Sequence, residues 1–122
     1  MIKVTVMVAV LLSLCGFAAG GEEQTFQDEV DQLLSFLENS ECEFNRNGTW
    51  YDGSKAVDHI KRKYNYLLKK NLVDSTESFI DRAATKSSMS GKAYQVRCGS
   101  GQPVESAVWF RAELNKMRAN AH

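Results

Sequence analysis

The stretch AYQVRC, residues 93–98, decides how the fold is predicted, because its residue types alternate. Tyr94, Val96 and Cys98 are apolar or sulfur-containing, and the residues between them are small or polar. Alternation with a period of two predicts a β-strand with one buried face. The strand ends on a cysteine, so the partner of Cys98 determines which segment lies beside it.

The N-terminal segment MIKVTVMVAVLLSLCGFAAG, residues 1–20, differs in character from the rest of the chain. It has one positive charge at Lys3, an apolar run over residues 4–14 and small residues at 18–20. This pattern is typical of a secretory signal peptide, and the apolar run is too short to span a bilayer. We therefore expect residues 21–122 to form a single exported domain with no membrane anchor after cleavage.

Removal of a signal peptide also simplifies the cysteine count. Cys15 is lost with the leader, and Cys42 and Cys98 remain as an even pair in an oxidising compartment. We expect one disulfide between them, which would stabilise a domain of this size by about 4 kcal/mol on a chain-entropy argument. The residues around Cys42 also alternate, so they predict a second short strand beside the first.

Four segments carry apolar residues at helical spacing. The first spans residues 25–38, the second begins near Asp52 and ends at about Lys70, and the third begins with an Asp74–Glu77 capping box. The fourth has Pro103 in its first turn and apolar residues through to Met117. We therefore predict a small, helix-rich α+β domain of about four helices, with a short two-stranded sheet clamped by a Cys42–Cys98 disulfide.

The composition excludes several function classes. The chain has 15 basic and 15 acidic residues, which makes nucleic acid and anionic membranes poor partners. Its two histidines, His59 and His122, match no zinc spacing and form no nucleophile motif with a serine or cysteine. We expect His59 to be a surface or partly buried helix residue. The prediction is a protein that is not an enzyme and needs no metal or cofactor.

Two longer stretches resemble a known family. FNRNGTWYDGSKAVDHIKRK, residues 44–63, and STESFIDRAATKSSMSGKAY, residues 75–94, followed by a helix with Trp109, resemble the YfeK-like family of small periplasmic proteins. Within that family, the chain is similar to periplasmic immunity proteins that act against a lysozyme-like effector of type VI secretion. The resemblance implies a periplasmic location and a secreted peptidoglycan hydrolase as partner. The implied function is to occlude the active site of that muramidase.

A shorter motif points to the same function. Ser90, Gly91 and Tyr94 form a Ser-Gly-x-x-Tyr pattern, similar to the loop that periplasmic lysozyme inhibitors insert into the enzyme's cleft. Hydroxyl and backbone N–H groups could there satisfy the carboxyls that normally meet sugar hydroxyls. The predicted partner-binding residues are Ser87, Ser88, Met89, Ser90, Gly91, Lys92 and Tyr94. A secondary contact set comprises Arg46, Gly48, Trp50, Tyr51, Gly53, Ser54 and Lys55.

Other interpretations remain open at this level. Residues 87–91 also suit an ordinary helix stop followed by a turn. Trp50 and Tyr51 suit either an exposed aromatic anchor or the core, whereas Trp109 is expected in the core. The alternative functions are a module that binds a cell-wall fragment or small ligand through Trp50, Tyr51 and Arg46, and a homo-oligomer, such as a homodimer, formed through an apolar helix face.

Overall fold

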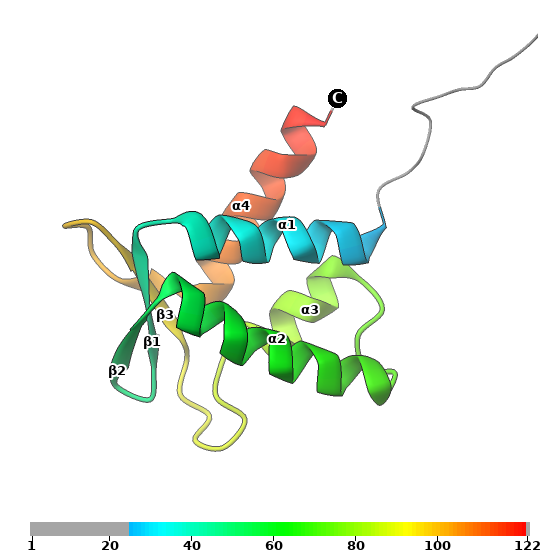
Figure 1. Ribbon diagram of the computed structural model, residues 1–122, viewed down its shortest axis with the longest axis horizontal. Coiled ribbons are helices and arrows are strands. Elements are labelled where there is room, and N and C mark those ends of the chain that lie inside the picture. The colour runs from blue at the N-terminus through cyan, green and yellow to red at the C-terminus, as the bar shows by residue number, and fades with distance from the viewer. Residues whose placement is uncertain (1–24, 122) are drawn as a thin grey trace, which may run out of the picture.

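A computed structural model describes residues 25–121, so the predicted signal peptide at residues 1–20 lies outside the described residues. These residues form four helices and a small sheet, and Figure 1 shows the sheet at one end of α1 and α2. The elements in chain order are α1 Phe26–Asn39, β1 Cys42–Arg46, β2 Thr49–Asp52, α2 Gly53–Lys69, α3 Thr76–Ala83, β3 Gln95–Cys98, β4 Val104–Glu105 and α4 Ser106–Asn120. This is the predicted helix-rich α+β fold.

The helix starts follow the polar residues that precede them. Thr25 and Asp28 form a capping box at α1, and the Asp52 carboxylate accepts a hydrogen bond from the Lys55 amide at 2.9 Å at the start of α2. The box predicted at Asp74 and Glu77 is wrong. Ser75 and Ser78 form the box of α3 instead, because each serine hydroxyl accepts a hydrogen bond from the other's backbone N–H.

The sheet has four antiparallel strands, in the order β2-β1-β3-β4, and not the two predicted. The predicted pair, β1 and β3, lies at its centre, where Cys42 is directly opposite Cys98 and bonded to it as a disulfide. β2 was missed because a tight turn at Asn47 and Gly48, both with positive φ, reverses the chain at once and returns it beside β1.

The start of the last helix also differs from the prediction. Val104 and Glu105 pair with β3 as the short strand β4, so α4 begins at Ser106 and Pro103 precedes the strand. The Ser106 amide still donates to the carbonyl of Tyr94 at 2.9 Å, which ends the ladder just where the helix starts. Val104 in β4 and Val108 in α4 are both exposed.

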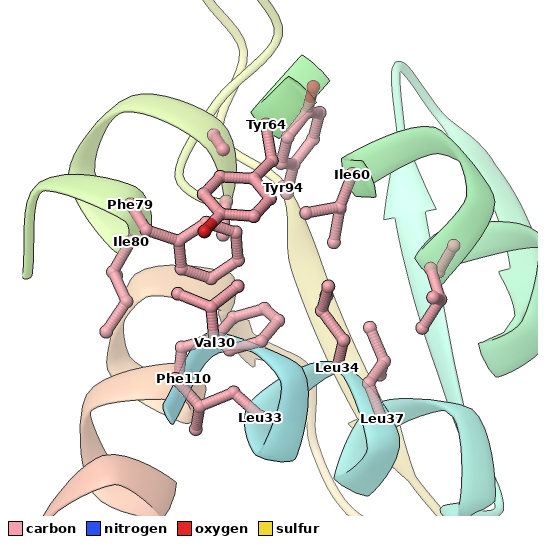
Figure 2. Close-up of a cluster of buried hydrophobic side chains, with 14 of the residues drawn as sticks. Val30, Leu33, Leu34, Leu37, Ile60, Tyr64, Phe79, Ile80, Tyr94 and Phe110 are labelled. Carbon is pink, nitrogen blue, oxygen red and sulfur yellow. The ribbon is translucent and has the colours of Figure 1, made fainter. Parts of the chain in front are cut away.

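The core lies where the four helices meet the inner face of the sheet. Figure 2 shows α1 side chains such as Leu33 and Leu37 facing Ile60 from α2 and Phe110 from α4. Phe44 and Val96 cover this core from the sheet and are fully buried. Trp109 is partly buried and packs against the same cluster, in agreement with the prediction. Among residues 25–121, no helix is long and apolar enough to cross a membrane.

Candidate functional site

The segment between α3 and β3 folds into a compact loop, drawn in yellow in Figure 1, which projects away from the helices. Lys86 and Ala93 form a bridge at its base, and the Ser87 amide donates to the carbonyl of Lys92 at 2.9 Å. The Gly91 amide donates to the carbonyl of Ser87 at 2.9 Å, and Gly91 has a φ of +75°, which favours glycine at this bend. We call residues 87–92 the 87–92 loop.

Ser87 and Asn47 hold this loop from within. The Ser87 side chain is buried, and its hydroxyl accepts hydrogen bonds from the amides of Met89 and Ser90 at 3.2 and 3.3 Å. Asn47, in the β1–β2 turn, donates to the Ser87 hydroxyl at 3.4 Å and accepts from the Ser90 hydroxyl at 2.5 Å. The loop is therefore tied to a hairpin that lies far from it in sequence.

Some of the predicted loop residues are buried and hold the loop in place, and the others are exposed to solvent. Ser87 and Tyr94 are 4% and 1% exposed, so they support the loop from within. The residues from Ser88 to Lys92 are exposed, and Met89 is the extreme case at 92%. Tyr94 supports the loop base, because its hydroxyl lies 3.1 Å from Nε2 of His59 on α2.

A groove that the sequence analysis missed lies between this loop and α2. The groove has a volume of about 380 Å³, and we call it the basic groove. Met89 and Ser88 form its loop side. Its other wall consists of Arg46, His59, Arg62, Lys63 and Tyr66. The four α2 residues follow the i, i+3, i+4, i+7 spacing of one helix face, a signal present in the sequence.

A second hollow opens between α2 and the β1–β2 hairpin, and we call it the hairpin cavity. It has a volume of about 200 Å³ and shares Arg46, His59 and Arg62 with the basic groove. Its remaining lining residues are Phe44, Tyr51, Lys55, Ala56 and Asp58. Three residues of the predicted secondary contact set, Arg46, Tyr51 and Lys55, therefore meet at one place.

The rest of that secondary set is dispersed. Trp50 points to the opposite face of the sheet from Tyr51, because neighbouring strand residues alternate, and its ring lies 3.9 Å from the guanidinium carbon of Arg97. Gly53 is buried, and a Cβ there would collide with the carbonyl oxygen of Leu37 on α1. Gly53 therefore allows the close packing of α2 on α1, and its contact with a partner stays a prediction. Gly48 and Ser54 are exposed, at the hairpin turn and the start of α2.

The electrostatic environment of the shared wall is strongly positive. Burial, followed by the charges of Arg46, Lys63 and Arg62, lowers the pKa of His59 from its ordinary value of 6.5 to about 4. Burial and the neighbouring Arg46 and Lys86 charges also lower the pKa of Lys63. Lys63 donates a 2.7 Å hydrogen bond to the Lys86 carbonyl, which fixes it beside the loop base. Near neutral pH, His59 is therefore a neutral hydrogen-bonding group among cations.

Arg46 and Arg62 differ from most other arginines of residues 25–121 in their lack of an ion pair. Arg97, Arg111 and Arg118 each form an ion pair with a carboxylate, whereas within residues 25–121 neither Arg46 nor Arg62 does. The Nε atom of Arg46 is buried and has no hydrogen-bond partner in that range. A buried donor without a partner is costly, so this wall is suited to accept an anionic group. Within the same range, no three His, Cys, Asp or Glu side chains are grouped to hold a metal.

Comparison with known proteins places the chain in a family. The model of DUF5329, described as a family of unknown function, matches residues 24–118. The chain is 32% identical over 92 residues to the protein named "Uncharacterized protein YfeK" from Salmonella typhimurium strain LT2, covering 75% of this chain and 73% of that protein. No solved structure matches. The chain therefore belongs to the DUF5329 family, and it is similar to the YfeK protein.

Proposed function

We propose that this protein is a periplasmic immunity protein that binds a secreted, lysozyme-like muramidase and occludes its active site. The single observation that carries the proposal is the 87–92 loop, which is pinned at both ends yet presents Met89 with 92% of its surface exposed. Methionine adapts its shape to a partner surface and is one of the residue types enriched in protein interfaces. The export, the periplasmic location and the partner are parts of this proposal.

The loop is preorganised for insertion. Its bridge at Lys86 and Ala93 leads directly into β3, and the disulfide at the end of β3 ties that strand to β1. Asn47 then joins the loop to the turn that follows β1. A loop that is already ordered loses little conformational entropy on docking, so more of the contact energy contributes to affinity.

The surroundings of the loop complement an acidic cleft. A muramidase cleft carries the two carboxyl groups needed for glycoside hydrolysis. Lys92 on the loop and Arg46, Arg62 and Lys63 in the basic groove lie at or beside the exposed methionine. Tyr66, at 59% exposure, adds an aromatic side chain at the rim. Aromatic residues, methionine and arginine are the types enriched in protein interfaces.

The test is inhibition of peptidoglycan lysis by a muramidase that binds this protein. The mature protein would be used to capture a periplasmic or secreted muramidase. The purified muramidase would then be assayed with and without this protein, and its activity followed as the loss of turbidity of a peptidoglycan suspension. We expect Met89→Glu to weaken inhibition at least tenfold. Phe36→Glu is the matched control, because it places the same charge at an exposed apolar residue on α1, outside the groove.

Two outcomes would contradict different parts of the proposal. If no peptidoglycan hydrolase is inhibited at micromolar protein, the immunity function is wrong. If Met89→Glu and Gly91→Trp both inhibit as strongly as the unaltered protein, the muramidase contacts another surface and the loop assignment is wrong. Both residues are exposed, so circular dichroism of each variant should show an unchanged overall fold, and the strain of tryptophan at the positive φ of Gly91 should be confined to the loop.

A further inference from the structure

The hairpin cavity is separate from the 87–92 loop and has the features of a small-ligand site. It lies between two elements, the β1–β2 hairpin and α2, which are joined directly because α2 begins at the residue after β2. Phe44 and Tyr51 give it an apolar side, and Arg46 and Arg62 give it a cationic side. Sites for small organic molecules commonly combine an apolar wall with a few convergent polar groups.

The cationic side has an unfilled donor. Arg46 occupies the end of β1, where its guanidinium Nε is buried without a hydrogen-bond partner in residues 25–121. Arg62 reaches the same cavity from α2 and is exposed. Two guanidinium groups from different elements can bind one planar anion through parallel N–H donors. A bound acid would supply the hydrogen-bond acceptor that the Arg46 Nε group lacks within residues 25–121.

The charge balance favours a singly charged acid. Asp58 also lines the cavity, so its carboxylate offsets part of the positive charge and disfavours a doubly charged phosphate. The neutral imidazole of His59 adds no charge near neutral pH. The ionisable groups around the imidazole are Arg46 from β1, Lys55, Asp58, Arg62 and Lys63 from α2, and Lys86 and Tyr94 from the segment before β3.

From this juxtaposition we propose that the hairpin cavity binds the carboxylate of a small organic acid, held by Arg46 and Arg62 with its body against Tyr51. The cavity has a volume of about 200 Å³ and lies beside the basic groove, with which it shares Arg46, His59 and Arg62. This inference rests on the cavity alone. It does not require the 87–92 loop or the muramidase, and its test fails or succeeds separately.

The experiment compares matched probes by isothermal titration and by NMR of the mature protein. N-acetylmuramic acid carries a lactyl carboxylate, and N-acetylglucosamine is the same sugar without it. We expect N-acetylmuramic acid to bind with one-to-one stoichiometry and to raise the pKa of His59, because an anion beside the imidazole offsets the Arg46, Lys63 and Arg62 charges. N-acetylglucosamine should bind at least tenfold more weakly.

Two substitutions on α2 distinguish specific binding in the cavity from a general effect of positive charge. Arg62→Gln should weaken N-acetylmuramic acid at least tenfold, whereas Lys61→Gln removes the same charge from an exposed neighbour that lines neither hollow. Arg46→Lys keeps the charge but loses the planar donor pair, so it should also weaken binding. Equal effects of Arg62→Gln and Lys61→Gln would overturn the proposal. So would equal binding of the two sugars, tighter binding of inorganic phosphate, or an unchanged His59 pKa at millimolar acid.

Discussion

The carboxamide oxygen of Asn47 accepts a hydrogen bond from the Ser90 hydroxyl at 2.5 Å, across 43 positions of sequence. This contact joins the turn of the β1–β2 hairpin to the exposed loop before β3. Asn47 also has a φ of +54°, a conformation that asparagine tolerates better than most residues. One side chain therefore both shapes the hairpin turn and orders the loop that we propose as the binding surface.

Replacement of Asn47 should loosen the loop without unfolding the domain. In Asn47→Gly the turn keeps its backbone conformation, but the contacts to Ser87 and Ser90 are lost. We expect faster amide hydrogen exchange at Ser90 and Gly91. Asn47→Ala should show the same exchange and lose about 1 kcal/mol more stability, because alanine is strained at positive φ. Unchanged exchange at both amides would show that the loop orders itself without Asn47.

His59 should make the stability of the folded protein depend on pH below neutrality. The folded pKa of His59 is about 4 and its ordinary value is 6.5, so between these pH values the unfolded chain binds more protons. The free energy of unfolding should therefore fall as the pH drops from 6.5 towards 4. Thermal melts of the unaltered protein and of His59→Gln should differ by a constant amount above pH 7, and the unaltered protein should lose stability relative to the variant below pH 6.5. Parallel curves across the whole range would contradict this assignment.

The Cys42–Cys98 disulfide closes a loop with a sequence separation of 56 and links the two central strands. We expect the Cys42→Ala/Cys98→Ala variant to lose about 2–4 kcal/mol in urea unfolding, chiefly because the unfolded chain gains conformational freedom. A reductant should lower the stability of the unaltered protein and leave the double variant unaffected. A similar effect of the reductant on both proteins would mean that it acts elsewhere.

Gly53 should be intolerant of any side chain. A Cβ at this position would collide with the backbone carbonyl of Leu37, which cannot rotate aside as a flexible side chain could. We expect Gly53→Ala to destabilise the fold by about 1–3 kcal/mol by forcing α2 away from α1. Ser54→Ala is the control in the same helical turn, and because Ser54 is exposed it should change stability by less than about 0.5 kcal/mol. Equal stabilities of the two variants would show that the helices adjust without cost.

Much of the fold could be predicted because its signals are local. Alternation in residues 93–98 predicted β3, the cysteine count predicted the disulfide, and helical spacing over residues 25–38 predicted α1. β2 and β4 could not be recognised in the same way. They are very short strands whose hydrogen bonds come from a neighbouring strand. The turn residues Asn47 and Gly48 are the local signal for β2, and β4 has no comparable signal.

The candidate site shows the same division between local and long-range information. The sequence indicated the loop residues and the alternative roles of Trp50 and Tyr51. It also contained the helical spacing of His59, Arg62 and Lys63, but that spacing was not recognised as one face of α2. Only the tertiary structure brought Arg46 from β1 to that face, placed Trp50 on the other side of the sheet and buried Gly53, Ser87 and Tyr94. The sequence by itself determined which segments are helices and central strands, since periodicity and capping act within a few residues. Burial, the neighbouring groove and cavity, and the positive charge that they share depend on contacts between distant segments, so only packing decided them.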